Sequence, residues 1–151
     1  MSNPSKFGFL ALLCALVSFA VIGCGTDSGP PRAPVAGKVT YRNFPLVGAM
    51  VTFIPESGGR SASGLTDAQG KFVLGTFEIT DGALIGPHKV AISARGPDRD
   101  LRPGEVGSGL PGEKMPGDPV IPVKYFEPTQ SGLTFEVKKG ANNAPEFNLT
   151  E

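Results

Sequence analysis

The chain has no tryptophan, one histidine and only two cysteines among its 151 residues. Cys14 lies inside an apolar run near the N-terminus, so Cys24 has no partner for a disulfide. A zinc site needs several histidine or cysteine ligands, and a nucleophilic triad cannot be assigned around His88. We therefore expect no enzymatic activity, no metal and no cofactor.

An excess of charge of either sign is also missing. Fourteen basic residues balance fourteen acidic ones, and no basic run is present. Proteins that bind nucleic acids or anionic membranes by charge carry a positive patch or stripe. The composition therefore excludes nucleic acid as an expected partner, and recognition must depend on shape and local groups.

Long amphipathic helical patterns are absent after residue 25, whereas 21 glycines and 15 prolines separate short apolar runs. Such spacing predicts an all-β domain of about seven strands over residues 35–151. In the second expected strand, Ala49–Pro55, the side chains of Val51 and Phe53 share one face. A further strand is expected after a loop within residues 57–66; the other expected strands are Val35–Tyr41, Ala49–Pro55, Lys71–Phe77, His88–Ala94, Val120–Phe126, Leu133–Lys139 and Glu146–Thr150.

The first 23 residues read as a signal peptide. One lysine precedes the apolar run Phe7–Ile22, and small residues follow it. The four residues Val21-Ile22-Gly23-Cys24 resemble the lipobox of bacterial lipoproteins. This resemblance implies cleavage between Gly23 and Cys24 and attachment of diacylglycerol to the Cys24 thiol. A plain signal peptide and an uncleaved anchor helix are the alternatives.

Residues 24–34 are expected to form a flexible tether behind the lipidated cysteine. Glycine and serine give this segment freedom, while its prolines favour extended geometry. Two acyl chains would hold the mature protein stably on a membrane. Gly25 follows the cysteine in place of aspartate, which in some double-membrane bacteria directs lipoproteins to the outer membrane. We expect a cell-envelope location facing the periplasm or the exterior.

Four motifs carry a second resemblance. They are Gly37-Lys38-Val39, Pro45-Leu46-Val47-Gly48-Ala49, Thr66-Asp67-Ala68-Gln69-Gly70-Lys71-Phe72 and Gly86-Pro87-His88-Lys89-Val90. Together they resemble the carboxypeptidase regulatory-like domain, which implies a Greek-key β-sandwich with transthyretin-like topology. The resemblance extends from Val35 to about Thr150 and is interrupted only by residues 95–119.

Three local features are candidates for a functional role. Asp67 lacks the alternating oxygen ligands that calcium requires, so we interpret Asp67 and Gly70 as turn residues. His88 is expected at a strand edge on the surface. Residues 95–119 are rich in proline, glycine and charge and are expected to form a long mobile loop; the alternative is a loop that orders on a partner.

The sequence therefore favours a lipid-anchored, non-enzymatic envelope protein with a structural or protein-interaction role. Its expected partners are membrane lipid through Cys24 and an envelope protein. The alternative is a carbohydrate-binding module, since related sandwiches bind glycans. Such sites stack sugars on exposed aromatic rings, and this chain has two tyrosines, Tyr41 and Tyr125, beside its phenylalanines.

Overall fold

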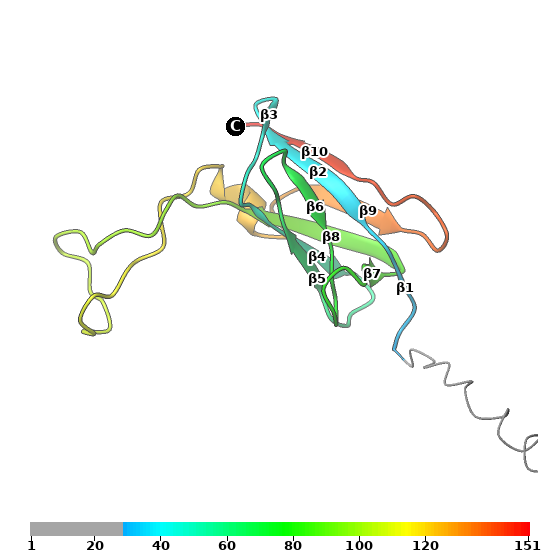
Figure 1. Cartoon of the computed structure of the whole chain (residues 1–151), viewed down its shortest axis with the longest axis horizontal. Coiled ribbons are helices and arrows are strands. Elements are labelled where there is room, and N and C mark those ends of the chain that lie inside the picture. The colour runs from blue at the N-terminus through cyan, green and yellow to red at the C-terminus, as the bar shows by residue number, and fades with distance from the viewer. Residues whose placement is uncertain (1–28) are drawn as a thin grey trace, which may run out of the picture.

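A computed structural model describes residues 29–151 and shows an all-β, sandwich-like protein (Figure 1). The expected signal segment, Gly23 and Cys24 lie outside the described residues. Residues 29–151 contain no helix with the length and apolar character needed to cross a membrane. The elements are β1 (Arg32–Ala33), β2 (Ala36–Tyr41), β3 (Phe44–Pro45), β4 (Met50–Pro55), β5 (Ala62–Leu65), β6 (Lys71–Val73), β7 (Ala83–Leu84), β8 (Gly86–Ser93), the 3-10 helix η1 (Val123–Phe126), β9 (Leu133–Val137) and β10 (Glu146–Leu149).

Two four-stranded sheets make up most of the fold. One has the order β5-β4-β8-β9, with antiparallel pairing throughout. In the other, β2 pairs in parallel with β10 and in antiparallel fashion with both β3 and β6. Hydrogen bonds between Ser63 and Gly75 connect the two sheets along one side. A short pair, β1 with β7, lies where the described chain begins.

The core lies between the two sheets and centres on Phe53. The alternation expected for the second strand is confirmed, because Val51 and Phe53 are fully buried. The Phe53 ring contacts Phe72 and Phe147 of the opposite sheet, with centroids 6.4 and 6.2 Å apart. It also contacts Phe135 at 5.9 Å. One side chain therefore joins strands from both sheets, which makes it the centre of the packing.

Two expected elements differ in the structure. Residues 120–126 were expected as a strand, but Val123–Phe126 form the 3-10 helix η1 after Pro122. Proline has no amide hydrogen to offer to a sheet, and the turn buries Tyr125 while Val123 remains exposed. The strand expected at residues 71–77 ends at Val73, because the chain then turns into the loop before β7.

The last part of the segment expected as a tether, residues 24–34, differs as well. Arg32 and Ala33 form β1 and pair with Leu84 and Ala83 of β7. Ala33 is only 3% exposed, so the folded part includes this strand rather than starting at Val35. The backbone pairing and the small buried side chain hold this part of the segment against the sandwich.

Residues 95–119 form a long excursion that extends away from the sheets (Figure 1). Isolated bridges join Arg95 to Pro119 and Arg99 to Met115, so the two arms lie antiparallel. The loop leaves from the end of β8, whereas the chain enters the described part beside β7, close to the start of β8. This strand of eight residues therefore separates the loop from the N-terminal side of the molecule.

Candidate functional site

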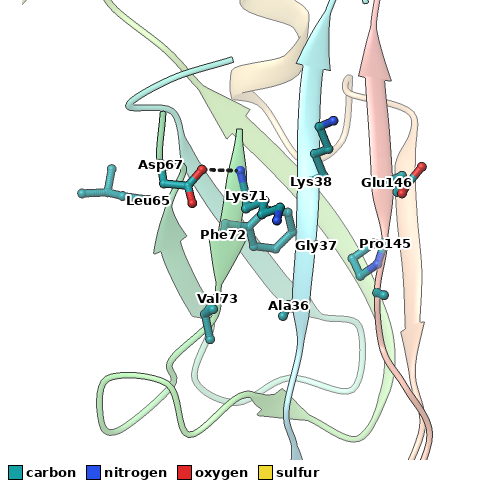
Figure 2. Close-up of a pocket in the computed structure, with 11 residues that line it drawn as sticks. Ala36, Gly37, Lys38, Leu65, Asp67, Lys71, Phe72, Val73, Pro145 and Glu146 are labelled. Carbon is teal, nitrogen blue, oxygen red and sulfur yellow. Dashed lines mark hydrogen bonds between the residues drawn. The ribbon is translucent and has the colours of Figure 1, made fainter. Parts of the chain in front are cut away.

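An open pocket of about 610 Å³ lies over the outer face of the β10-β2-β6 sheet (Figure 2). Its apolar side is made by Ala36 of β2, Val73 of β6 and Leu65 of β5. Leu65 is 61% exposed and Val73 is 47% exposed, so both form an uncovered rim. The remaining lining residues are Gly37, Lys38, Asp67, Lys71, Phe72, Ala144, Pro145 and Glu146.

Sheet register places charged side chains in one row beside the apolar side. Lys38 pairs with Lys71 of β6 and, on its other side, with Glu146 of β10. Paired residues on adjacent strands point to the same face, so these three side chains project together. Asp67 also lines the pocket. Together with Asp67, the row gives the pocket two positive and two negative groups, which favours a partner with both signs of charge.

The floor of the pocket depends on a glycine. The backbone of Gly37 pairs with Phe72, whose ring is buried beneath it. A Cβ atom at position 37 would lie 2.7 Å from this ring and closer still to the carbonyl oxygen of Pro145. That oxygen accepts a hydrogen bond from the Lys38 amide at 2.9 Å and joins β10 to β2. Gly37 therefore allows three strands to meet under the pocket.

Asp67 shapes the turn at one side of the pocket. Its Oδ1 atom accepts hydrogen bonds from the amides of Gln69 and Lys71, both at 2.8 Å. Gly70 has φ +73° and its amide donates to the Asp67 carbonyl at 2.9 Å. Glycine adopts this left-handed conformation without the steric cost of a side chain. The structure thus gives both residues the turn contacts expected from the sequence, and it also places Asp67 at the pocket.

The pocket is lined by charged and apolar groups that a ligand can contact. Its polar side chains are two lysines and two carboxylates, spread over the β10-β2-β6 face and the turn at residues 67–70. Over residues 29–151, no cluster of three or more histidine, cysteine, aspartate or glutamate side chains is placed to hold a metal ion. The pocket thus places exposed apolar side chains beside charges of both signs.

His88 is not at the surface, contrary to the expectation from the sequence. It is 1% exposed and its ring lies 5.8 Å from that of Phe53. The strand begins at Gly86, and alternation places His88 on the same inward face as Val90 and Ile92. The two-residue period of Val90 and Ile92, which is present in the sequence, extends back to His88 and gives it this inward position.

Burial favours the neutral form of the His88 side chain. Nδ1 lies 2.9 Å from the Gly86 carbonyl oxygen and donates to it, while Nε2 is buried without a hydrogen-bond partner. Burial lowers the pKa of His88, and the Gly86 hydrogen bond and the nearby Glu56 charge oppose this only in part. The neutral ring is therefore the form that the core accommodates.

We expect the free energy of unfolding to fall as pH decreases below about 6.5, the ordinary pKa of histidine. In this range the unfolded chain takes up a proton that folded His88 resists, so acid favours unfolding. Urea midpoints at pH 7.5 and 5.5 measure the effect. His88→Phe should remove most of the difference between the two values. An equal difference in the variant would contradict the assignment to His88.

The loop at residues 95–119 carries its own network of charges. Arg99 donates two hydrogen bonds to Glu105 at 2.7 and 2.8 Å, and these hold the pKa of Glu105 down at about 2. Lys114 pairs with Asp100, and Arg102 pairs with Asp118. Exposed ion pairs contribute little stability, so the expected mobility of the loop stays a prediction.

The tyrosines offer little surface for stacking a sugar. Tyr125 is buried and its hydroxyl donates to the Thr150 carbonyl at 3.1 Å. Tyr41 is partly buried and the Arg42 guanidinium lies 5.2 Å from its ring centre. Phe72 lines the pocket but is only 2% exposed. The pocket therefore lacks the open aromatic platform that the carbohydrate alternative would use.

Comparison with models of known families, with curated proteins and with solved structures gives no match for this chain. The pocket was not found from the sequence, because Leu65, Val73 and Ala36 come together only through strand pairing. Their outward positions within short alternating runs were the available signal, and this signal does not say which strands are neighbours.

Proposed function

We propose that the protein is a lipid-anchored, non-enzymatic component of a bacterial cell envelope that binds another protein. The pocket over the β10-β2-β6 sheet is the single observation that carries the binding role. Its exposed apolar rim at Leu65 and Val73 lies beside a row of mixed charge. A polypeptide segment supplies both apolar side chains and charges of both signs.

The anchoring part of the proposal rests on the resemblance of Val21–Cys24 to a lipobox. Acylated Cys24 would hold the sandwich at the membrane, with outer-membrane delivery favoured by Gly25. The finer fold assignment, a Greek-key sandwich related to carboxypeptidase regulatory-like domains, is part of the same proposal. It is supported by the four sequence motifs and by the two facing sheets.

Site-specific photo-crosslinking in intact cells tests the binding role. A photoreactive residue at position 73 should capture a neighbouring envelope protein, whereas the same residue at Thr134, an exposed position of β9, should not. Leu65→Glu places a charge on the apolar rim and should reduce capture at position 73 about tenfold, the effect of losing one good interface contact.

Three outcomes would count against the proposal. Absence of any protein adduct at position 73 contradicts the binding role. Binding of a glycan array that is lost in Leu65→Glu would instead support the carbohydrate alternative. An unmodified Cys24 in the mass spectrum of the mature protein contradicts the lipid anchor, and Cys24→Ala serves as the matched variant for that measurement.

A further inference from the structure

The loop between β6 and β7 exposes two apolar side chains at its tip. Ile79 is 93% exposed and Phe77 is 46% exposed. Between Ile79 and the buried Gly82, Thr80 has φ +72°. A β-branched residue rarely adopts this left-handed conformation, and it persists only where the surrounding structure holds it. The backbone of the tip is therefore strained at Thr80, next to the exposed side chain of Ile79.

Hydrogen bonds within the loop hold this conformation. The Asp81 carboxylate accepts from the amides of Thr76 and Phe77 at 2.6 and 3.1 Å. The Thr76 hydroxyl donates to the Gly82 carbonyl at 2.7 Å. Arg32 of β1 lies 3.2 Å from the same carboxylate. The tip is thus fixed to the strand through which the chain enters the fold.

Cationic side chains lie beside the exposed ring. The guanidinium groups of Arg32 and Arg60 lie 4.9 and 5.4 Å from the centre of the Phe77 ring. The Arg32 side chain is 11% exposed, whereas Arg60 is exposed. The exposed Glu78 lies between Phe77 and Ile79. Apolar side chains beside charges of both signs match the layered chemistry of a membrane surface, where acyl chains lie below charged headgroups.

The position of the loop gives it access to such a surface. Gly29 and Arg32 line one pocket together with Phe77, Ile79 and Thr80. Only four residues, 25–28, separate Cys24 from Gly29 in the sequence. Fully extended, this stretch spans at most about 18 Å. An acylated Cys24 would therefore keep this end of the sandwich near the lipid.

We propose that the loop at residues 76–82 rests on the membrane surface and inserts Ile79, with the Phe77 ring, at the boundary between the lipid headgroups and the acyl chains. This inference rests on the proposed lipid anchor at Cys24. It orients the sandwich, because the loop at residues 95–119 leaves from the other end of β8 and would point away from the membrane. The pocket over the β10-β2-β6 sheet would then face sideways from the anchored end.

The absence of tryptophan allows a direct test with a single reporter. The full gene carrying Ile79→Trp is expressed, and the protein is purified from membranes and reconstituted in phosphatidylcholine vesicles with brominated acyl chains. Emission from Trp at position 79 should shift to shorter wavelength and be quenched by the bromines. Val106→Trp is the matched control, because Val106 is 92% exposed on the loop at residues 95–119, and its emission should be unaffected.

Amide hydrogen exchange gives a second reading that needs no substitution. Exchange at residues 77–80 should slow in vesicles relative to the detergent-solubilised protein, while exchange at residues 106–110 should be unchanged. Quenching that is equal at positions 79 and 106, or no protection at residues 77–80, overturns the inference.

Flotation and mass spectrometry separate this inference from the proposed anchor. A protein that floats with vesicles and carries an acylated Cys24, but shows no quenching at position 79, overturns the loop contact alone. A protein with unmodified Cys24 that does not float overturns both. Quenching at position 79 in a floating protein with unmodified Cys24 would support the loop contact and overturn only the lipid anchor.

Discussion

Phe53→Ala should lower the free energy of unfolding by about 3–5 kcal/mol, the cost typical of emptying a large aromatic site in a core. Phe53 is fully buried and its ring contacts Phe72 and Phe147 across the interface between the sheets. Removal of the ring leaves a cavity where the two sheets meet. Because small domains have only about 5–15 kcal/mol of stability, the loss is a large part of the total.

Urea unfolding followed by far-ultraviolet circular dichroism measures this effect, since the chain has no tryptophan for fluorescence. Phe44→Ala is the matched control, because Phe44 is 75% exposed and its loss should cost less than about 0.5 kcal/mol. Similar urea midpoints for the two variants would show that Phe53 is not the centre of the core.

Gly37→Val should destabilise the protein by about 3 kcal/mol, at the upper end of the range for overpacking. The first added carbon would meet the Phe72 ring and the Pro145 carbonyl oxygen. The carbonyl cannot move freely, because it accepts the Lys38 amide and joins β10 to β2. Relief of the clash therefore requires β10 or β6 to shift away from β2.

Ala36→Val tests whether the effect belongs to position 37. Ala36 is the preceding residue of the same strand, but it is exposed on the outer face, and valine suits a strand. Its urea midpoint should stay close to that of the unsubstituted protein. A Gly37→Val protein as stable as Ala36→Val would mean that the strands pack less closely than in this structure.

Strand positions followed well from the sequence where alternation and turn residues agreed. The expected strand Ala49–Pro55 alternates clearly and ends at a proline, and β4 begins one residue later, at Met50. The same reasoning failed at residues 120–126, where apolar residues between prolines resembled a strand but form η1. Short apolar runs are compatible with either geometry, and Pro122 together with burial of Tyr125 decided between them.

The pocket shows more clearly what alternation along a sequence does not predict. Lys38, Lys71 and Glu146 are far apart in the chain, and only the register of β2 with β6 and β10 brings them into one row. Leu65 reaches the same place from the other sheet. Alternation predicts which face of its own strand a residue occupies, but it does not predict which strands are adjacent.

The sequence by itself determined the all-β class, the inward face of β4 and the turn residues Asp67 and Gly70. These depend on local backbone preference and on a two-residue period, both of which are readable along the chain. Tertiary structure alone decided the pairing of β1 with β7, the row of charges over the β10-β2-β6 sheet and the exposed tip at Ile79. The first two require distant segments to meet, and such meetings are selected by packing of the whole core rather than by any short stretch of residues. The tip is held by hydrogen bonds within its own loop and by Arg32 of β1.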